Sequence, residues 1–317
     1  PSMPRGNGTD EKRSNLANDK RSDLSDALQN AAIRTILGGI LALPYATRVH
    51  LMGRIASHVI APLAGWRKRI RENLAHALPD LSQAEIDRLV REVPDNVGRT
   101  LIEIYSGREF KDRVAGTPLS GPGAEALRTA REAGRPVVLV TAHMGNFDAL
   151  RAILFAEGYE LGALYREMNN KRFNVHYVNA LSQIGTPLFP TNREGVARFV
   201  RHLAKGGIIG ILTDVYNTKG AEVTFFGQPA PTSTAACVWA VKHNAVVIPC
   251  YGLRQPDGLS FRLLLETPVP HRDPTEMTQE INDRLEAVVR ESPEQWFWIH
   301  RRWKPERTKR RRARSRT

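Results

Sequence analysis

Cysteine is scarce in this sequence. Only two of the 317 residues are cysteines, Cys237 and Cys250, and they lie thirteen positions apart within apolar segments. The chain has no CxxC pair and no histidines at zinc-finger spacing, which argues against a disulfide framework or a zinc finger as the basis of the fold. We interpret both cysteines as buried thiols in a reducing compartment.

Long hydrophobic runs are also missing. No run reaches the roughly 18 uninterrupted apolar residues that indicate a transmembrane helix. Hydrophobic residues nevertheless make up 41% of the chain, which is enough for a sizeable core. The nearest candidate for a membrane segment, TILGGILALPYA at 35–46, is short and contains Pro44. We expect a globular protein in which this segment lies at a membrane interface.

Acidic residues are fewer than basic ones, 33 against 46, and the formal net charge is +13. Residues 301–317 alone carry +9 of this charge, which leaves +4 for the rest of the chain. A basic stretch of this density attracts either the phosphate backbone of a nucleic acid or the head groups of anionic lipids. Because the body of the chain has no nucleic-acid-binding motif, we expect an anionic membrane surface as the partner and no nucleic acid.

The pattern of residues divides the chain into four parts. Residues 1–23 are polar and are expected to be disordered, with an artificial addition before Met3. Residues 24–115 carry apolar side chains at spacings of three and four, which predicts a helical, membrane-associating portion. Residues 116–304 are expected to form an α/β core, and 305–317 a polybasic tail.

Within the helical part, GWRKRIRENLAHALP at 65–79 combines a basic face with an apolar one. Its basic face is either a solvated helix surface or a surface that meets phosphate groups, and the pattern leaves both readings open.

Beyond about residue 118, short apolar runs alternate with helical patterns, which is typical of an α/β sheet. Strands are predicted at 135–143, 158–166, 206–214, 245–253 and 259–269. Helices are predicted at 122–133, 146–157, 171–184, 193–205, 233–243 and 275–291. The expected fold class is therefore α/β, with a mixed, mostly parallel central sheet flanked by helices.

The segment VTAHMGNFDAL at 140–150 places polar residues between a buried strand and a helix. Ligands of open α/β sheets bind beyond the carboxyl ends of the strands, where His143 is expected. Gly145 permits a turn and Asn146 can cap the helix, so the Asp148 carboxylate could fold back toward the imidazole. Such a pair would make His143 a general base.

A plainer interpretation is equally compatible with this spacing. Asn146 and Asp148 are good helix-start residues, and a histidine at a strand end can simply bond to the backbone. There is no GxSxG elbow, so no covalent nucleophile is expected.

A second polar cluster, Thr232 and Ser233, precedes the predicted helix at 233–243. These hydroxyls either cap the helix or form a wall of the site that meets an anion or an oxyanion. The histidines at 176, 202, 243 and 271 show no ligand spacing, so no metal and no bound cofactor are expected.

The motif HMGNFD at 143–148 resembles the HxxxxD/E motif of the glycerolipid acyltransferase superfamily. The branch it most resembles is the bacterial lipid A biosynthesis (lauroyl/myristoyl) acyltransferase family. The resemblance spans nearly all of residues 40–304. It includes, in order, LPYATRVHLMGRI, RKRIRENLAHALPDLSQAEIDRLV, YREMNN, KGGIIGILTD, FFGQPAPTSTAA and PEQWFWIHRRWK.

This resemblance implies the transfer of a fatty acyl chain from an acyl thioester, carried by acyl carrier protein or coenzyme A, to a lipid hydroxyl. It also implies a peripheral location at the cytoplasmic face of the inner membrane. Carried onto this chain, it makes His143 the general base and Asp148 its orienting carboxylate. Arg166 would meet acceptor phosphate, and Asp214 matches an aspartate at the end of the following strand.

One departure from the family pattern affects the expected acceptor. Family members commonly show DQD or DQ where this chain has Asp214-Val215-Tyr216. A lipid A precursor is the first expectation, and a lyso-aminolipid of the ornithine-lipid type or another lysolipid is the alternative. A nucleic-acid-binding protein that acts through the basic tail is the distant third reading.

Overall fold

A computed structural model describes residue 31 and residues 33–304. The expected N-terminal segment 1–23 and the polybasic tail 305–317 lie outside the described residues, so the predictions made for them stay predictions.

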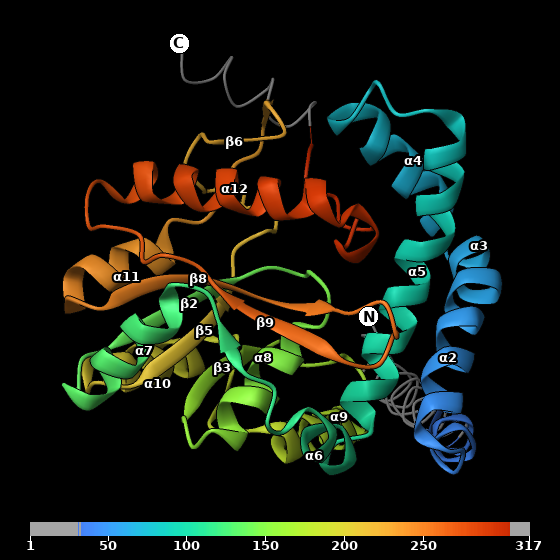
Figure 1. The fold of residues 1–317 in the computed structure, drawn as a ribbon, viewed down its shortest axis with the longest axis horizontal. Coiled ribbons are helices and arrows are strands. Elements are labelled where there is room, and N and C mark those ends of the chain that lie inside the picture. Colours follow the sequence, from blue (N-terminus) through green and yellow to red (C-terminus); the bar gives the residue numbers. More distant parts are fainter. Residues whose placement is uncertain (1–30, 32, 305–317) are drawn as a thin grey trace, which may run out of the picture.

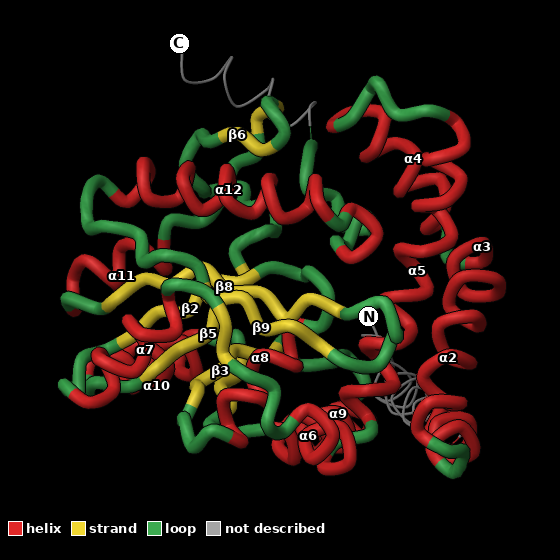
Figure 2. Tube along the Cα trace, in the orientation of Figure 1, coloured by secondary structure: helices red, strands yellow, loops and turns green. Residues whose placement is uncertain are grey.

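A seven-stranded sheet forms the centre of the structure (Figures 1 and 2). In spatial order its strands are β1 (Leu119–Ser120), β9 (Phe261–Leu265), β8 (Val246–Arg254), β2 (Val137–Thr141), β5 (Ile208–Leu212), β3 (Leu161–Tyr165) and β4 (Leu188–Pro190). Only the β8–β9 pair is antiparallel, and the other neighbours are parallel. The predicted α/β class with a mixed, mostly parallel sheet is therefore confirmed.

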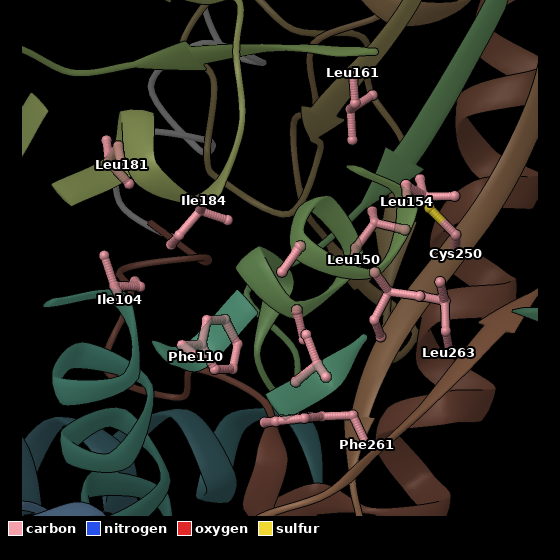
Figure 3. Packing of buried hydrophobic residues seen from close by; sticks show 14 of the residues in the cluster. Ile104, Phe110, Leu150, Leu154, Leu161, Leu181, Ile184, Cys250, Phe261 and Leu263 are labelled. Carbon is pink, nitrogen blue, oxygen red and sulfur yellow. The ribbon is translucent and has the colours of Figure 1, made fainter. Parts of the chain in front are cut away.

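Both faces of the sheet are covered by other elements, as the central strand β2 shows. All five of its residues are buried, and its apolar side chains alternate between two apolar clusters. Val137 and Leu139 pack into the larger cluster, which includes α8 and α9 (Figure 3), whereas Val138 and Val140 join a cluster with α10, α11 and α12. The helices of this region are α7 (Gly123–Glu132), α8 (Phe147–Ala156), α9 (Lys171–Ile184), α10 (Arg193–Ala204), α11 (Ala235–His243) and α12 (Pro274–Glu291).

A layer of helices precedes the first strand and packs along one side of the sheet (Figure 1). It contains α2 (Tyr45–Ile55), the π-helical turn η1 (Ala56–Ile60), α3 (Ala61–Leu63), α4 (Trp66–Ala77), α5 (Gln83–Tyr105) and α6 (Arg108–Val114). The long helix α5 starts with a capping box, in which Ser82 and Glu85 exchange hydrogen bonds. No helix among the described residues is long and apolar enough to cross a membrane.

Three short elements complete the chain. The strands β6 (Thr224–Phe225) and β7 (Gln228–Pro229) form a small hairpin. The 3₁₀ turn η2 (Pro293–Gln295) follows α12 and leads the chain back toward the carboxyl end of β2, where Met144 forms an isolated β-bridge with Trp296.

Candidate active site

The register of two parallel strands brings His143 and Asp214 together. Thr141 on β2 pairs with Leu212 on β5, and each candidate residue lies two positions beyond its strand's end. The two residues therefore leave the same edge of the sheet side by side, as the carboxyl ends of parallel strands do.

The Asp214 carboxylate holds His143 at two points. Its Oδ1 lies 2.9 Å from Nδ1 of the imidazole, and its Oδ2 accepts a hydrogen bond of 2.9 Å from the His143 backbone N–H. Trp296 Nε1 donates a further bond of 3.0 Å to the same Oδ2. These contacts fix the orientation of the ring and engage Nδ1, so that Nε2 is the nitrogen left for a ligand.

Asp214 is fully buried, and its surroundings keep it ionised. Burial alone would raise the pKa of this carboxyl group, but the charge of His143 and the hydrogen bonds from it outweigh burial and hold the pKa well below its ordinary value. The imidazole, in contrast, keeps 25% of its side chain exposed. A buried anion behind a partly exposed imidazole is the arrangement that a general base requires.

The expected pairing of His143 with Asp148 is wrong. Asp148 is buried in the first turn of α8 and forms an ion pair with Arg151, one turn further along the same helix. Arg151 in turn donates hydrogen bonds of 3.0 and 2.8 Å to the carbonyl oxygens of Leu181 and Gly185 on the α9 side. The Asp148–Arg151 ion pair therefore links α8 to the α9 side. The partner of His143 comes instead from the end of the neighbouring strand β5.

Asn146 is the N-cap of α8, as predicted, and it holds the turn that carries His143. Its side-chain oxygen accepts hydrogen bonds from the N–H groups of Asp148 and Ala149, and its amide nitrogen donates a bond of 2.7 Å to Glu103 on α5. The side chain is fully buried. Both polar atoms of the side chain are therefore hydrogen-bonded within the protein. Asn146 holds the turn in place and is not open to a substrate.

A buried ion pair supports the same turn from behind. Glu103 accepts two hydrogen bonds, of 2.6 and 2.8 Å, from the guanidinium of Arg254 on β8. On the same face of α5, Asn96 and Thr100 both donate to the Gly145 carbonyl oxygen at 3.1 Å. Helix α5 thus holds the loop that follows His143 in place through charge-assisted and neutral hydrogen bonds to Gly145 and Asn146.

Only glycine fits at position 145. Its φ is +58°, and a Cβ built there would lie 2.1 Å from the carbonyl oxygen of Gly252. The predicted role of Gly145 as the turn residue is confirmed, and the close approach of β8 adds a second reason for it.

The remaining predicted site residues lie at different places around this edge. Arg166 is exposed directly after β3, at the carboxyl edge of the sheet where the parallel strand β5 also ends. No hydrogen bond or ion pair of its side chain is present within the described part of the chain, so the guanidinium stands free at the rim.

Thr232 and Ser233 are engaged inside the protein. The Thr232 hydroxyl is fully buried, donates to the Ala230 carbonyl and accepts a hydrogen bond of 2.6 Å from Arg302. The Ser233 hydroxyl accepts a hydrogen bond of 3.3 Å from the N–H of Ala235, at the start of α11. The N-cap residue of α11 is Thr234, and it forms no side-chain cap hydrogen bond, so neither Thr232 nor Ser233 is the N-cap. Thr232 instead binds the C-terminal segment through Arg302.

The sequence argument missed the residues that close the site from the C-terminal side. The His300 ring lies 4.4 Å from the His143 ring, centroid to centroid, and Phe297 N–H donates a hydrogen bond of 3.0 Å to the His143 carbonyl. Burial and the nearby His143 lower the pKa of His300 to about 4, so its ring is neutral at pH 7. His300 lies in the motif PEQWFWIHRRWK, and no local spacing predicts its contact with His143, because 157 positions separate the two residues.

The open α/β sheet thus carries a hydrogen-bonded His–Asp pair at its carboxyl edge. The family model for bacterial lipid A biosynthesis acyltransferases matches residues 20–305. The chain therefore belongs to this family of acyltransferases.

Curated relatives of the chain fall into two groups by acceptor. It is 24% identical over 278 residues to the lipid A biosynthesis lauroyltransferase of Escherichia coli, covering 85% of this chain and 89% of the relative. It is 25% identical over 269 residues to the lipid A biosynthesis palmitoleoyltransferase of E. coli, covering 83% and 86%. It is also 25% identical over 285 residues to the phosphatidylinositol mannoside acyltransferase of Mycolicibacterium smegmatis, covering 87% and 91%.

Proposed function

We propose that this protein transfers a fatty acyl chain from an acyl thioester to a hydroxyl group of a membrane lipid, with a lipid A precursor as the acceptor. The proposed donor is acyl carrier protein, with coenzyme A as the alternative carrier. The lipid A relatives support the acceptor, and the observation that carries the chemistry is the His143–Asp214 pair, whose Nδ1–Oδ1 distance is 2.9 Å.

In the proposed reaction, Nε2 of His143 takes the proton of the acceptor hydroxyl as its oxygen attacks the thioester carbonyl carbon. The carbon–sulfur bond then breaks, and the imidazolium returns the proton to the leaving thiolate. Asp214 stabilises the imidazolium and fixes the tautomer, because its carboxylate accepts a hydrogen bond from Nδ1–H throughout the reaction. A positioned base of this kind contributes roughly 10²- to 10⁴-fold to the rate.

Arg166 is proposed to bind a phosphate group of the acceptor. Its guanidinium is exposed at the same sheet edge as Asp214, and arginine binds phosphate through two parallel hydrogen bonds. A peripheral position at the cytoplasmic face of the inner membrane is proposed as well. Exposed apolar side chains on the N-terminal helices support it, with Ile36 63%, Val59 51% and Leu63 84% exposed.

The test is a transfer assay with purified protein, acyl carrier protein thioester and a lipid A precursor. His143→Ala is expected to lose transfer by at least about 10²-fold, whereas the matched control His243→Ala, in a histidine at the end of α11, keeps wild-type transfer. Undiminished transfer by a folded His143→Ala protein would remove the base from the proposal.

A second acceptor class has specific support. Val215 follows Asp214 directly and is 40% exposed, and the mannoside acyltransferase relative shows that acceptors other than lipid A occur among similar proteins. A lyso-aminolipid of the ornithine-lipid type would fit an apolar rim at this point. Lipid mass spectrometry of cells with and without the gene separates the two, because loss of a diacyl aminolipid with unchanged lipid A would exclude the lipid A precursor.

A further inference from the structure

Two histidines and one aspartate converge at the carboxyl edge of the sheet. One ring nitrogen each of His143 and His300 and one carboxylate oxygen of Asp214 all lie within 4.8 Å of one another. The proposed reaction uses His143 and Asp214 but gives His300 no task. Nε2 of His300 is buried and, within the described residues, has no hydrogen-bond partner. Buried polar atoms without a partner are rare, and such an atom calls for an explanation.

Two imidazoles and a carboxylate are ligands that divalent zinc prefers in proteins. Zinc–nitrogen and zinc–oxygen bonds of about 2.1 Å place tetrahedral ligand atoms about 3.4 Å apart. His143 Nδ1 and Asp214 Oδ1 are already 2.9 Å apart, so the spacing of this pair needs only a small opening. Because all the ligand atoms lie within 4.8 Å of one another, the cluster as a whole requires a contraction of at most about 1.4 Å.

The surroundings orient the carboxylate without using up its metal-binding oxygen. Asp214 Oδ2 accepts hydrogen bonds from the His143 N–H and from Trp296 Nε1, whereas Oδ1 has, among the described residues, only the imidazole as its partner. Outer hydrogen bonds of this type hold ligands in place at metal sites. The partial exposure of His143 gives an ion access from solvent and leaves a fourth position for water.

We propose that zinc binds reversibly to His143, Asp214 and His300 and that the bound ion inhibits acyl transfer. Zinc takes the lone pair of one imidazole nitrogen, separates His143 from its carboxylate, and opposes proton uptake at the other nitrogen by its positive charge. The inhibition rests on the proposed function, whereas the binding does not.

The test uses the purified full-length chain after treatment with a chelator. Zinc binding is measured by competition with a chromophoric chelator, and Co²⁺ reports the geometry of the site through its visible absorption bands. Acyl transfer is measured on the same samples. We expect one zinc ion per chain, loss of transfer over the same zinc concentrations, and recovery on addition of EDTA.

Two matched variants locate the site. His300→Gln is expected to weaken zinc binding about tenfold or more and to shift inhibition to correspondingly higher zinc concentrations. His243→Gln is the control, because His243 also has a buried Nε2 without a partner among the described residues but lies outside the cluster. Thermal melting checks that both variants fold.

Wild-type zinc affinity in a folded His300→Gln protein, or no binding of Zn²⁺ or Co²⁺ by the wild-type chain, would overturn the site. Full transfer activity with zinc bound would overturn its inhibitory effect. A chain that binds zinc through these residues but shows no acyl transfer under any condition would contradict the proposed function and still support the metal site.

Discussion

Two buried carboxylates flank the candidate base, and their surroundings differ in one decisive respect. Asp214 at the end of β5 is hydrogen-bonded to an imidazole, a side chain that can act as a general base. Asp148 at the start of α8 forms an ion pair with the guanidinium of Arg151, which has no acceptor atom for a proton. Both carboxylates are at most 2% exposed, so burial does not distinguish them. The two carboxylates therefore differ in their partners, and in the proposed mechanism Asp214 is the one that orients the base.

The largest effect on turnover that distinguishes the two carboxylates is expected for Asp214→Asn. The amide cannot stabilise the imidazolium and favours the wrong tautomer, so transfer should fall by roughly 10²- to 10⁴-fold. Steady-state transfer rates of the purified protein measure the effect, and circular dichroism checks the fold. A folded variant with wild-type turnover would remove Asp214 from the proposed mechanism.

Asp148→Asn should lower the stability of the protein more than it lowers turnover. It leaves the Arg151 guanidinium buried without its counter-charge, which costs about 3–5 kcal/mol of unfolding free energy. Urea unfolding measures this loss.

The double variant Asp148→Leu/Arg151→Met is the control for Asp148→Asn, because it removes both charges and should recover most of the stability. If Asp148→Asn instead keeps full stability and loses turnover by the factor expected of Asp214→Asn, the roles assigned to the two carboxylates are reversed.

The Asp214 side also carries a histidine that should make stability depend on pH. The pKa of His300 is lowered to about 4 in the folded protein, chiefly by burial, against about 6.5 in an unfolded chain. The unfolded chain therefore binds more protons between these values. The neutral His300 ring contributes about 3 kcal/mol to the free energy of unfolding. This contribution is fully present above about pH 6.5 and is lost as the pH falls toward 4.

Urea unfolding of wild type and His300→Gln from pH 7 to pH 4 tests this dependence. The variant should show a shallower loss of stability on acidification, and identical slopes for the two proteins would contradict the assignment.

Trp296→Phe gives the smallest expected effect. It removes the 3.0 Å hydrogen bond to Asp214 Oδ2, which keeps the bond from the His143 N–H. A hydrogen bond to a charged group is worth about 1.5–3 kcal/mol, and part of this stabilisation should be lost from the transition state, so turnover should fall by about tenfold. A loss as large as that of Asp214→Asn would show that the indole does more than orient the carboxylate.

Much of the fold could be predicted from the sequence, because the spacing of apolar residues in a long segment indicates whether it forms a helix or a strand. The helix predicted at 171–184 matches α9 in full. Four of the five predicted strands contain an observed strand, and the fifth, at 245–253, ends one residue before the end of β8. The strands β1 and β4 were missed because segments of two or three residues carry no measurable periodicity. The β6–β7 hairpin was missed for the same reason.

The site was only half predictable, since its partners are set by the order of strands in space. His143 and its glycine turn follow from local spacing. Its pairing with Asp214, 71 positions further along the chain, follows only once β2 and β5 are known to be neighbours in register. Asp148 was a natural expectation from the motif, but nothing in the motif shows that Arg151 would take its carboxylate.

The path of the chain after α12 has a consequence for assembly. Trp296, Phe297 and His300 reach the His143 loop only after every strand of the sheet has been laid down, and Asn73 on α4 clasps the backbone carbonyls of Trp298 and His300. A chain that stops before Pro293 would thus contain every strand of the sheet but lack the residues that contact the His143 loop. Residues 293–304, and not the sheet alone, complete the candidate site.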